Sequence, residues 1–370
     1  MSLTKRSWWL VISILLALII GFFIGNFISG KSFGRKFLPS GDSKINRVLD
    51  IVNEDYVDPV NMKELTDEAI ERLINELDPH SAYISKEELQ AFNEDMDGSF
   101  GGIGVDYIRR MDTLIISHVL PGSPAAQAGL MRGDRILTAN DSSLVGPDLT
   151  ENKIVASLRG KVNTTVTLGI WRNSSKQPMS FEITRSDIPL TTVKAAYVVE
   201  KGIGFIKIHD KFSHSTYKEF IHALAKLSAT GCRSYIIDLR MNGGGAMDAA
   251  INIANEFLPA GRMIVYTEGK AFPREEAHAN GTGTCQNSPL VILTDQLSAS
   301  ASEIVAGAIQ DNDRGLIIGR RSFGKGLVQN QIDLPDHSAI RLTIARYYTP
   351  SGRNIQRKYE LGKTDEYNRE

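Results

Sequence analysis

Three serines at the start of an apolar helical pattern are the first residues in this chain that could do chemistry. The segment Ser298-Ala-Ser-Ala-Ser302 follows an apolar run at residues 290–294, which predicts a buried strand. The first N–H groups of a helix have no internal acceptor and carry the positive end of the helix dipole, so they can stabilise an oxyanion beside a nucleophile. Ser300 and Glu303 also have the spacing of a capping box, which is a purely structural role. The residue types alone do not choose among the three serines.

A serine nucleophile needs a base, and the best candidate is a lysine. None of the seven histidines accompanies a Gly-x-Ser-x-Gly elbow, so the sequence does not support a Ser-His-Asp hydrolase. Lys325 lies between Gly324 and Gly326, which allow close approach to other backbone, and burial can lower the pKa of a lysine toward neutrality. If the chain is a strand there, Gln329 lies on the same face and could orient the amine. A glutamine at such a position is more often only a strand residue.

Two other motifs overlap the lysine, and neither fits its usual chemistry. Residues 319–325 satisfy Gly-x-x-x-x-Gly-Lys, but Gly326 stands where a phosphate-binding loop needs a Ser or Thr for Mg²⁺. The acidic strand also precedes this loop, which reverses the usual order. Ser322 and Lys325 match Ser-x-x-Lys, yet no Ser-Asp-Asn or Lys-Thr-Gly segment accompanies them. The sequence therefore predicts neither a nucleotide nor a metal cofactor.

A glycine-rich turn near residue 100 could hold an anion. Residues 99–105 read Ser-Phe-Gly-Gly-Ile-Gly-Val, and glycines let successive backbone N–H groups converge on a carboxylate. Taken alone, such a turn is more often a plain β-turn. Together with the short helix and tight turn predicted at residues 121–136, it resembles a PDZ domain of the kind attached to proteases, in which a peptide adds as a strand and its C-terminal carboxylate binds the loop. The peptide-binding residues that this resemblance implies are Gly102, Ile103, Gly104, Val105 and, assisting by charge, Arg159.

The composition around these residues is that of a globular protein without a nucleic-acid partner. The 370 residues are 42% hydrophobic and 23% charged, which is ordinary globular usage and excludes wholesale disorder. There are 42 Lys and Arg against 43 Asp and Glu, so the net charge of -1 offers no basic surface to a polyanion. Cys232 and Cys285 have neither a metal-site spacing nor a disulfide framework, and they either pair with each other or are inert.

The first 30 residues predict a membrane anchor. Residues 8–29 carry no charge, follow Lys5 and Arg6, and are about long enough to cross a bilayer as a helix. A cleavable signal peptide would end in an Ala-x-Ala-like site, which this run lacks, so we expect an uncleaved transmembrane helix at residues 1–30. The positive N-terminus is expected to stay in the cytoplasm, with everything after Lys31 outside.

The rest of the chain divides by its pattern into four parts. Residues 43–97 carry spaced apolar faces and predict a helical region that supports the chemistry without performing it. Residues 98–185 predict short strands with turn signals and make up the PDZ-like β domain. Residues 186–358 alternate strand and helix and predict an α/β core with buried strands, and residues 359–370 form a polar tail.

Read in order, several segments resemble one peptidase family over nearly the whole chain from about residue 43. They are Leu77-Asp-Pro-His-Ser81, the PDZ-like segment, residues 238–245, residues 298–304 and Phe323-Gly-Lys-Gly326. Together they resemble the carboxyl-terminal processing (tail-specific) serine peptidases, which implies a crotonase-like ββα-spiral core with an inserted PDZ domain. The resemblance also implies the catalytic residues: Ser300 as nucleophile, Lys325 as general base and Gln329 as the residue that orients the lysine. The oxyanion hole would consist of backbone N–H groups of Ala301, Gly243 and Gly244.

The function expected from this resemblance is that of a membrane-anchored serine endopeptidase with a Ser-Lys dyad. It would cleave exported proteins near their C-termini, with the substrate tail held by the PDZ-like domain. The catalytic part is expected in the periplasm or cell envelope, outside a bacterial inner membrane. The partners would be protein or peptide substrates and the membrane, assembly into a homo-oligomer is left open, and no cofactor is expected. The alternative is a PDZ-bearing scaffold protein with an inactive peptidase core.

Overall fold

The computed structural model describes residues 44–147, 149–360 and 367, and it divides the chain into two units, one ending at Ala69 and one beginning at Ile70. The region predicted to be helical contains α2 (Lys44–Asp55), α3 (Met62–Asn75) and α4 (Lys86–Asp97). Helix α4 begins where the Ser85 hydroxyl accepts the Glu88 N–H and ends at Gly98 in the left-handed conformation. The anchor predicted at residues 1–30 lies outside the described residues. None of the described helices has the length and hydrophobicity that crossing a bilayer requires.

An antiparallel β domain with its own hydrophobic core follows α4. Its strands alternate buried and exposed side chains, as in β7, where Val166, Leu168 and Ile170 are fully buried. The sheet has the order β3-β4-β5-β7-β8, with β6 paired to β5. Its elements are β3 (Val105–Arg110), β4 (Thr113–Val119), α5 (Pro124–Gln127), β5 (Arg135–Ala139), β6 (Ser142–Ser143), α6 (Glu151–Leu158), β7 (Thr165–Trp171) and β8 (Pro178–Thr184).

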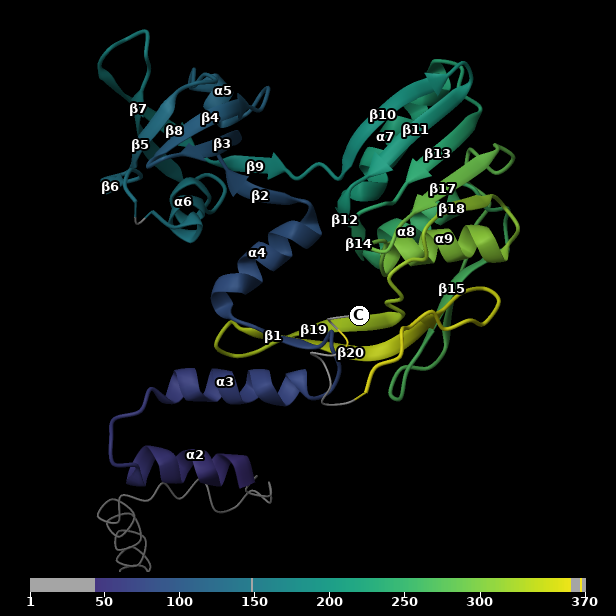
Figure 1. Ribbon diagram of the computed structural model, residues 1–370, viewed down its shortest axis with the longest axis horizontal. Coiled ribbons are helices and arrows are strands. Elements are labelled where there is room, and N and C mark those ends of the chain that lie inside the picture. The colour runs from purple at the N-terminus through teal and green to yellow at the C-terminus, as the bar shows by residue number, and fades with distance from the viewer. Residues whose placement is uncertain (1–43, 148, 361–366, 368–370) are drawn as a thin grey trace, which may run out of the picture. The chain divides into compact units, whose positions relative to one another are not determined.

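A two-stranded ribbon carries the chain into and out of this β domain. Strand β2 (Ser99–Gly102) precedes β3, strand β9 (Ser186–Pro189) follows β8, and the two pair antiparallel with Gly102 opposite Ser186 (Figure 1). The glycine-rich turn of residues 99–105 is therefore split between the end of β2 and the start of β3.

The predicted α/β core is present and is built on a mostly parallel sheet of order β10-β11-β13-β17-β18. Strands β11, β13, β17 and β18 run parallel to one another, so successive strands are joined by crossover connections. Helix α7 lies in the connection from β11 to β13, and α9 lies in the connection from β17 to β18 (Figure 1). The elements are β10 (Val193–Glu200), β11 (Ile203–Ile208), α7 (Thr216–Ala229), β13 (Ser234–Asp238), α8 (Met247–Asn255), β17 (Leu290–Thr294), α9 (Ala301–Asp311) and β18 (Leu316–Gly319). Cys232 and Cys285 are buried free thiols in this core, so they are not paired with each other.

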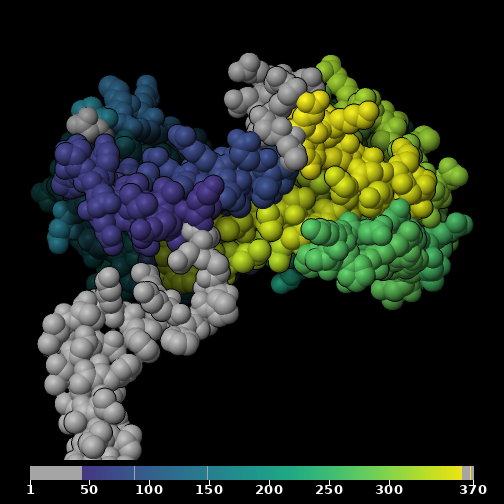
Figure 2. Space-filling view, turned by 90° about the horizontal axis from the view of Figure 1, so that it is seen from below, coloured from purple at the N-terminus to yellow at the C-terminus, as the bar shows by residue number. Residues whose placement is uncertain are grey.

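The chain also forms a second five-stranded sheet. It has the order β1-β20-β15-β16, and β19 also pairs with β20, placing Gln329 opposite Thr343. Figure 2 shows its yellow C-terminal strands beside the green segment that carries β15 and β16. The strands are β1 (Ala82–Ile84), β15 (Met263–Glu268), β16 (Glu275–His278), β19 (Leu327–Asp333) and β20 (Ala339–Tyr348), and a separate parallel pair joins β12 (Asp210–Phe212) to β14 (Asn242–Gly245).

Candidate active site

The three candidate serines occupy very different surroundings. Ser298 is fully buried, and its hydroxyl donates to the Leu239 carbonyl at 2.9 Å. Ser302 is also fully buried, and its hydroxyl donates to Asn242 Oδ1 at 2.9 Å. Ser300 is partly exposed and lines a cavity of about 650 Å³. Of the three serines, Ser300 is therefore the one whose side chain adjoins open space.

Ser300 lies on a strained turn between β17 and α9. It caps the N-terminus of α9 with φ 52° and ψ −112°, a conformation that L-residues rarely adopt. Strain of this kind costs on the order of 1–3 kcal/mol and persists only where the surrounding structure imposes it. A sharp strand-to-helix turn also projects a side chain away from the backbone, as nucleophile elbows do. The turn thus presents Ser300 to the cavity.

The cavity brings together five of the six residues predicted to form the dyad, to orient its lysine or to form the oxyanion hole. The sixth, Ala301, is buried directly beside it as the first residue of α9. The predicted residues that line the cavity are Gly243, Gly244, Ser300, Lys325 and Gln329.

Lys325 points its amine at Gln329. Its Nζ donates to Gln329 Oε1 at 2.9 Å. Strand alternation does not account for this contact, because Lys325 precedes β19 and a bulge interrupts the strand at Gln329. Burial and, after it, the positive charge of Arg341 lower the pKa of Lys325 to about 8, while the carboxylates of Asp78 and Glu303 oppose the shift. The described hydrogen bonds include none between Lys325 Nζ and the Ser300 hydroxyl. A lysine with this pKa is partly neutral near pH 8 and can accept a proton.

Glu303 joins the backbone of the serine to the backbone of the lysine, a connection that the sequence did not reveal. Its Oε2 accepts the N–H groups of Ser300 at 2.8 Å and Lys325 at 2.9 Å, and its Oε1 accepts the Gly324 N–H at 2.7 Å. Burial raises the pKa of this carboxyl, and these hydrogen bonds oppose the rise. The Ser-x-x-Glu spacing was the available signal, but it suggested only a helix cap.

Tyr347 makes a second connection between the same two segments. Its hydroxyl lies 2.6 Å from the carbonyl oxygen of Lys325 and 3.0 Å from that of Ser300, and the residue is 1% exposed. Burial holds the pKa of the phenol well above its ordinary value, so the hydroxyl stays protonated and donates to these carbonyls. Nothing in the local sequence marks this tyrosine, because both contacts come from distant parts of the chain.

The predicted oxyanion segments lie against each other. A Cβ atom at Gly244 would come within 2.6 Å of Ser300 Cβ and 3.0 Å of the Ala301 nitrogen, so only glycine fits here. The structure differs from the expectation in one respect, because the Gly244 N–H already donates to Asn242 Oδ1 at 2.9 Å. Ala301 opens α9, where a helix leaves its N–H groups without internal acceptors.

The Leu77–Ser81 motif supports the glutamine. Asp78 Oδ1 accepts the N–H groups of His80 and Ser81, each at 2.8 Å, which fixes a tight turn. The carbonyl of His80 in turn accepts a hydrogen bond from Gln329 Nε2. Burial, with the charge of Lys325, lowers the pKa of His80 to about 4, so its ring is neutral above that pH. The motif therefore holds the carboxamide with its oxygen toward the lysine.

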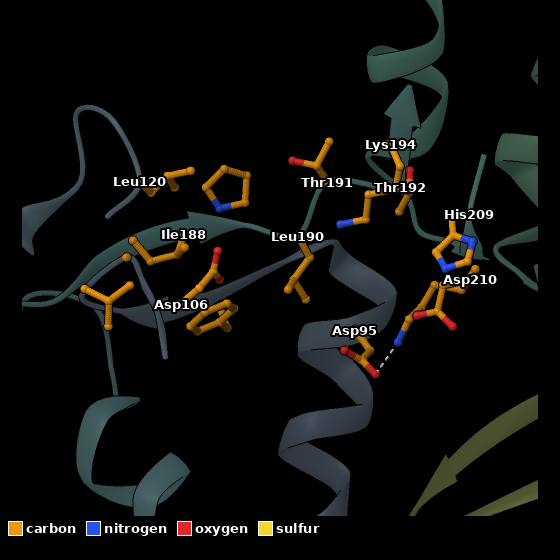
Figure 3. Close-up of a pocket in the computed structure, with 15 residues that line it drawn as sticks. Asp95, Asp106, Leu120, Ile188, Leu190, Thr191, Thr192, Lys194, His209 and Asp210 are labelled. Carbon is orange, nitrogen blue, oxygen red and sulfur yellow. Dashed lines mark hydrogen bonds and ion pairs between the residues drawn. The ribbon is translucent and has the colours of Figure 1, made fainter. Parts of the chain in front are cut away.

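The predicted peptide-binding residues lie near a second cavity, of about 330 Å³. Figure 3 shows Asp106 and Ile188 on one side of it and Lys194 and His209 on the other. Of the predicted residues, Gly104 and Val105 line this cavity, whereas Gly102 and Ile103 are buried beside it.

Arg159 does not line this second cavity. Its guanidinium forms an ion pair with Glu94 at 3.1 Å and lies 3.9 Å from the centroid of the Phe100 ring. These contacts attach the end of α6 to α4 and β2, and the sequence suggested neither of them.

Comparison with known proteins places this arrangement in a family. Residues 202–366 match the model of Peptidase family S41, and residues 115–172 match a PDZ domain. A carboxyl-terminal-processing protease of Synechocystis sp. is 35% identical over 373 residues, covering 96% of this chain and 86% of that protein. The carboxy-terminal processing protease CtpA of Bacillus subtilis is 34% identical over 360 residues, covering 96% of this chain and 76% of that protein. A solved photosystem II D1 C-terminal processing protease is 28% identical with a TM-score of 0.47, covering 85% of this chain and 84% of that one. The chain therefore belongs to peptidase family S41 and is a carboxy-terminal processing serine peptidase with a PDZ domain.

Proposed function

We propose that Ser300 and Lys325 form a Ser-Lys catalytic dyad in which Gln329 orients the lysine. The observation that carries the proposal is the hydrogen bond from Lys325 Nζ to Gln329 Oε1 inside the cavity that Ser300 also lines. The lowered pKa of Lys325 supports it, because only a neutral amine can accept the hydroxyl proton.

The proposed reaction needs no group beyond these residues, the substrate and water. Lys325 takes the proton of the Ser300 hydroxyl while the oxygen attacks the scissile carbonyl carbon. The resulting oxyanion is stabilised by the N–H groups of Ala301 and Gly243, because the Gly244 N–H donates to Asn242 Oδ1. As the C–N bond breaks, the protonated lysine returns its proton to the leaving amine. Water then attacks the acyl carbon and loses a proton to Lys325. Lys325 returns this proton to the Ser300 oxygen as the ester bond breaks, which releases the carboxylate product and restores the serine.

The proposed substrates are exported proteins cut near their C-termini, with the tail held by the PDZ domain. The loop Gly102–Ile103–Gly104 would take the terminal carboxylate, and the peptide would add as a strand beside Val105. The cavity lined by Gly104 and Val105 supports this placement, whereas Arg159 is paired with Glu94 and does not line the cavity.

The proposed setting is a bacterial inner membrane, with the catalytic part in the periplasm or cell envelope. The support is the uncharged run at residues 8–29 behind Lys5 and Arg6. We further propose that the core is a crotonase-like ββα spiral, which the parallel order of β11, β13, β17 and β18 supports.

The test of the dyad is turnover of an unfolded protein substrate by four chains. Ser300→Ala and Lys325→Arg should each lose activity by at least about 1000-fold, because arginine keeps the charge but cannot deprotonate in this range. Gln329→Ala should retain a reduced rate, because it loses only the orientation of the amine. The unaltered chain should show a rate that rises with pH through about 8, the pKa of Lys325, since deprotonation creates the base.

Thermal unfolding and tail-peptide binding of each variant serve as controls for folding. Substantial turnover by a folded Lys325→Arg chain would show that another group is the base. Equal activity of Ser300→Ala and the unaltered chain would remove Ser300 as the nucleophile.

A further inference from the structure

Arg341 brings a positive charge into the Ser300 cavity that no carboxylate pairs with among the described residues. It lines the cavity from β20, and its Nε is buried without a hydrogen-bond partner. Of the other basic side chains that line the cavity, Lys211 pairs with Asp95 and His214 lies 3.1 Å from Asp248. A partly buried charge without a counter-ion is costly, which is why such groups are normally paired.

The register of β20 places this charge close to the catalytic lysine. Residues 341 and 343 lie on one face of the strand, and Thr343 is the cross-strand partner of Gln329, which holds Lys325. The guanidinium carbon lies 5.4 Å from the centroid of the Phe92 ring, and Phe92 lines the cavity from α4. Aromatic packing and strand register therefore fix Arg341 at the wall of the cavity.

Asp78 does not neutralise this arginine. Its charge opposes the lowering of the Arg341 pKa that burial causes, but no ion pair joins the two residues within the described part of the chain. The Asp78 oxygens are already occupied, since they accept hydrogen bonds from His80, Ser81 and Thr343. The guanidinium is thus left with donors available to a group from outside the chain.

We propose that Arg341 binds a carboxylate of the peptide substrate beside the scissile bond, and so selects for acidic substrates. This inference rests on the proposed function, because the anion is expected on a peptide lying across Ser300. Carboxylates are the anions that an unmodified peptide offers, and the planar guanidinium donates two parallel hydrogen bonds to such a group. The carboxylate comes either from an Asp or Glu side chain or from the α-carboxylate of a bound end.

The test measures peptide affinity in the full chain carrying Ser300→Ala, so that binding is read without cleavage. The probes are amidated peptides in which a single Glu or Lys is moved through every position of one sequence. A second pair compares a free acid with its amide. The affinity of each pair is measured with three chains, which carry Arg341, Arg341→Gln or Arg341→Glu. Arg346→Glu is the matched control, because Arg346 is an exposed residue of the same strand.

At one position the Glu peptide should bind about tenfold more tightly than the Lys peptide, which is a modest effect for a charge-assisted contact. Arg341→Gln should bring that ratio near one, Arg341→Glu should reverse it, and Arg346→Glu should leave it unchanged. If the α-carboxylate is the partner, the ratio of the affinities for the free acid and its amide should fall near one in Arg341→Gln and reverse in Arg341→Glu.

The inference would be overturned if both affinity ratios, Glu to Lys peptide at every position and free acid to amide, were identical in the Arg341 chain and the Arg341→Glu chain. If both variants fail to fold, the absence of any acidic preference in the Arg341 chain would overturn it as well. Turnover by the chain with Ser300 intact is measured separately. Loss of the proposed function would appear there as absent cleavage, while failure of the Arg341 inference would leave cleavage intact without charge selectivity.

Discussion

The cavity at Ser300 and the cavity at the PDZ loop are held together in different ways. At Ser300, two almost fully buried side chains, Glu303 and Tyr347, each form hydrogen bonds with the backbone of both Ser300 and Lys325. At the PDZ loop, backbone hydrogen bonds set the shape, such as the Ala125 N–H to the Ile103 carbonyl at 2.9 Å. The ion pair Lys211–Asp95 at the rim of the second cavity is a third to almost half exposed.

This difference shows how the molecule separates chemistry from binding. Hydrogen bonds to buried groups are costly to lose, because the orphaned partner cannot turn to water. Partly exposed ion pairs contribute little, because water replaces them readily. The proposed reacting groups are therefore preorganised by burial, while the proposed peptide-binding cavity has a rim that can rearrange at low cost. Four variants of the chain test this contrast.

Glu303→Gln should have the largest effect. A glutamine offers one oxygen in place of two, so at least one N–H of Ser300, Gly324 or Lys325 loses its acceptor. We expect the free energy of unfolding to fall by about 2–4 kcal/mol and kcat to fall by about 100-fold. Removing the negative charge also lowers the pKa of Lys325, so the rise of rate with pH should begin below about 8.

Denaturant unfolding and a pH–rate profile check this prediction, with the exposed Glu275→Gln as control. A Glu303→Gln chain with unchanged stability and an unchanged profile would mean that the buried carboxylate does not organise the site.

Tyr347→Phe removes one hydroxyl and keeps the packed ring. Both carbonyl contacts disappear, so the Ser300 and Lys325 segments should be held less firmly. We expect kcat to fall by about tenfold with KM nearly unchanged, because the phenol is buried and its hydrogen bonds hold the proposed reacting groups in place. Steady-state kinetics check this, with Tyr348→Phe, the next residue along the strand, as matched control. An effect confined to KM would contradict a positioning role.

Gly104→Ala should weaken tail binding and leave the chemistry intact. Gly104 has φ 79°, and a Cβ there would come within 2.3 Å of Ser123 Cβ. We expect affinity for a free-acid tail to fall by about fivefold and the preference for acid over amide to disappear. Gly133→Ala is the control, because Gly133 also has positive φ but open space around it. Peptide binding equal to that of the unaltered chain would remove this loop from tail recognition.

Deletion of residues 1–30 should have the smallest effect on catalysis. The uncharged run at residues 8–29 contains none of the proposed catalytic residues. The shortened chain should leave the membrane fraction and cleave an unfolded substrate with kcat/KM within about twofold of the full chain. Fractionation and turnover check this. A folded but inactive product would show that the segment does more than tether.

The sequence by itself determined the local features of this protein. Apolar residues repeat with the period of a strand or of a helix, and this spacing predicted the buried strands and helices of the core. The spacing is a local signal, because it follows from the backbone geometry of a single element. The glycines around Lys325 and the serines at the start of α9 are likewise local signals, and they predicted both segments of the proposed active site. The family resemblance followed from such segments read in order.

The tertiary structure decided which of these residues face each other. It buries Ser298 and Ser302 and leaves Ser300 at the cavity, a choice that depends on Leu239 and Asn242, some 60 residues away along the chain. It also brings the His80 carbonyl to Gln329 across 249 residues. Arg341 and Tyr347 gain their positions in the same way, from the pairing of β20 with distant strands. No local pattern encodes contacts of this range, because they arise only when separate elements pack into one core.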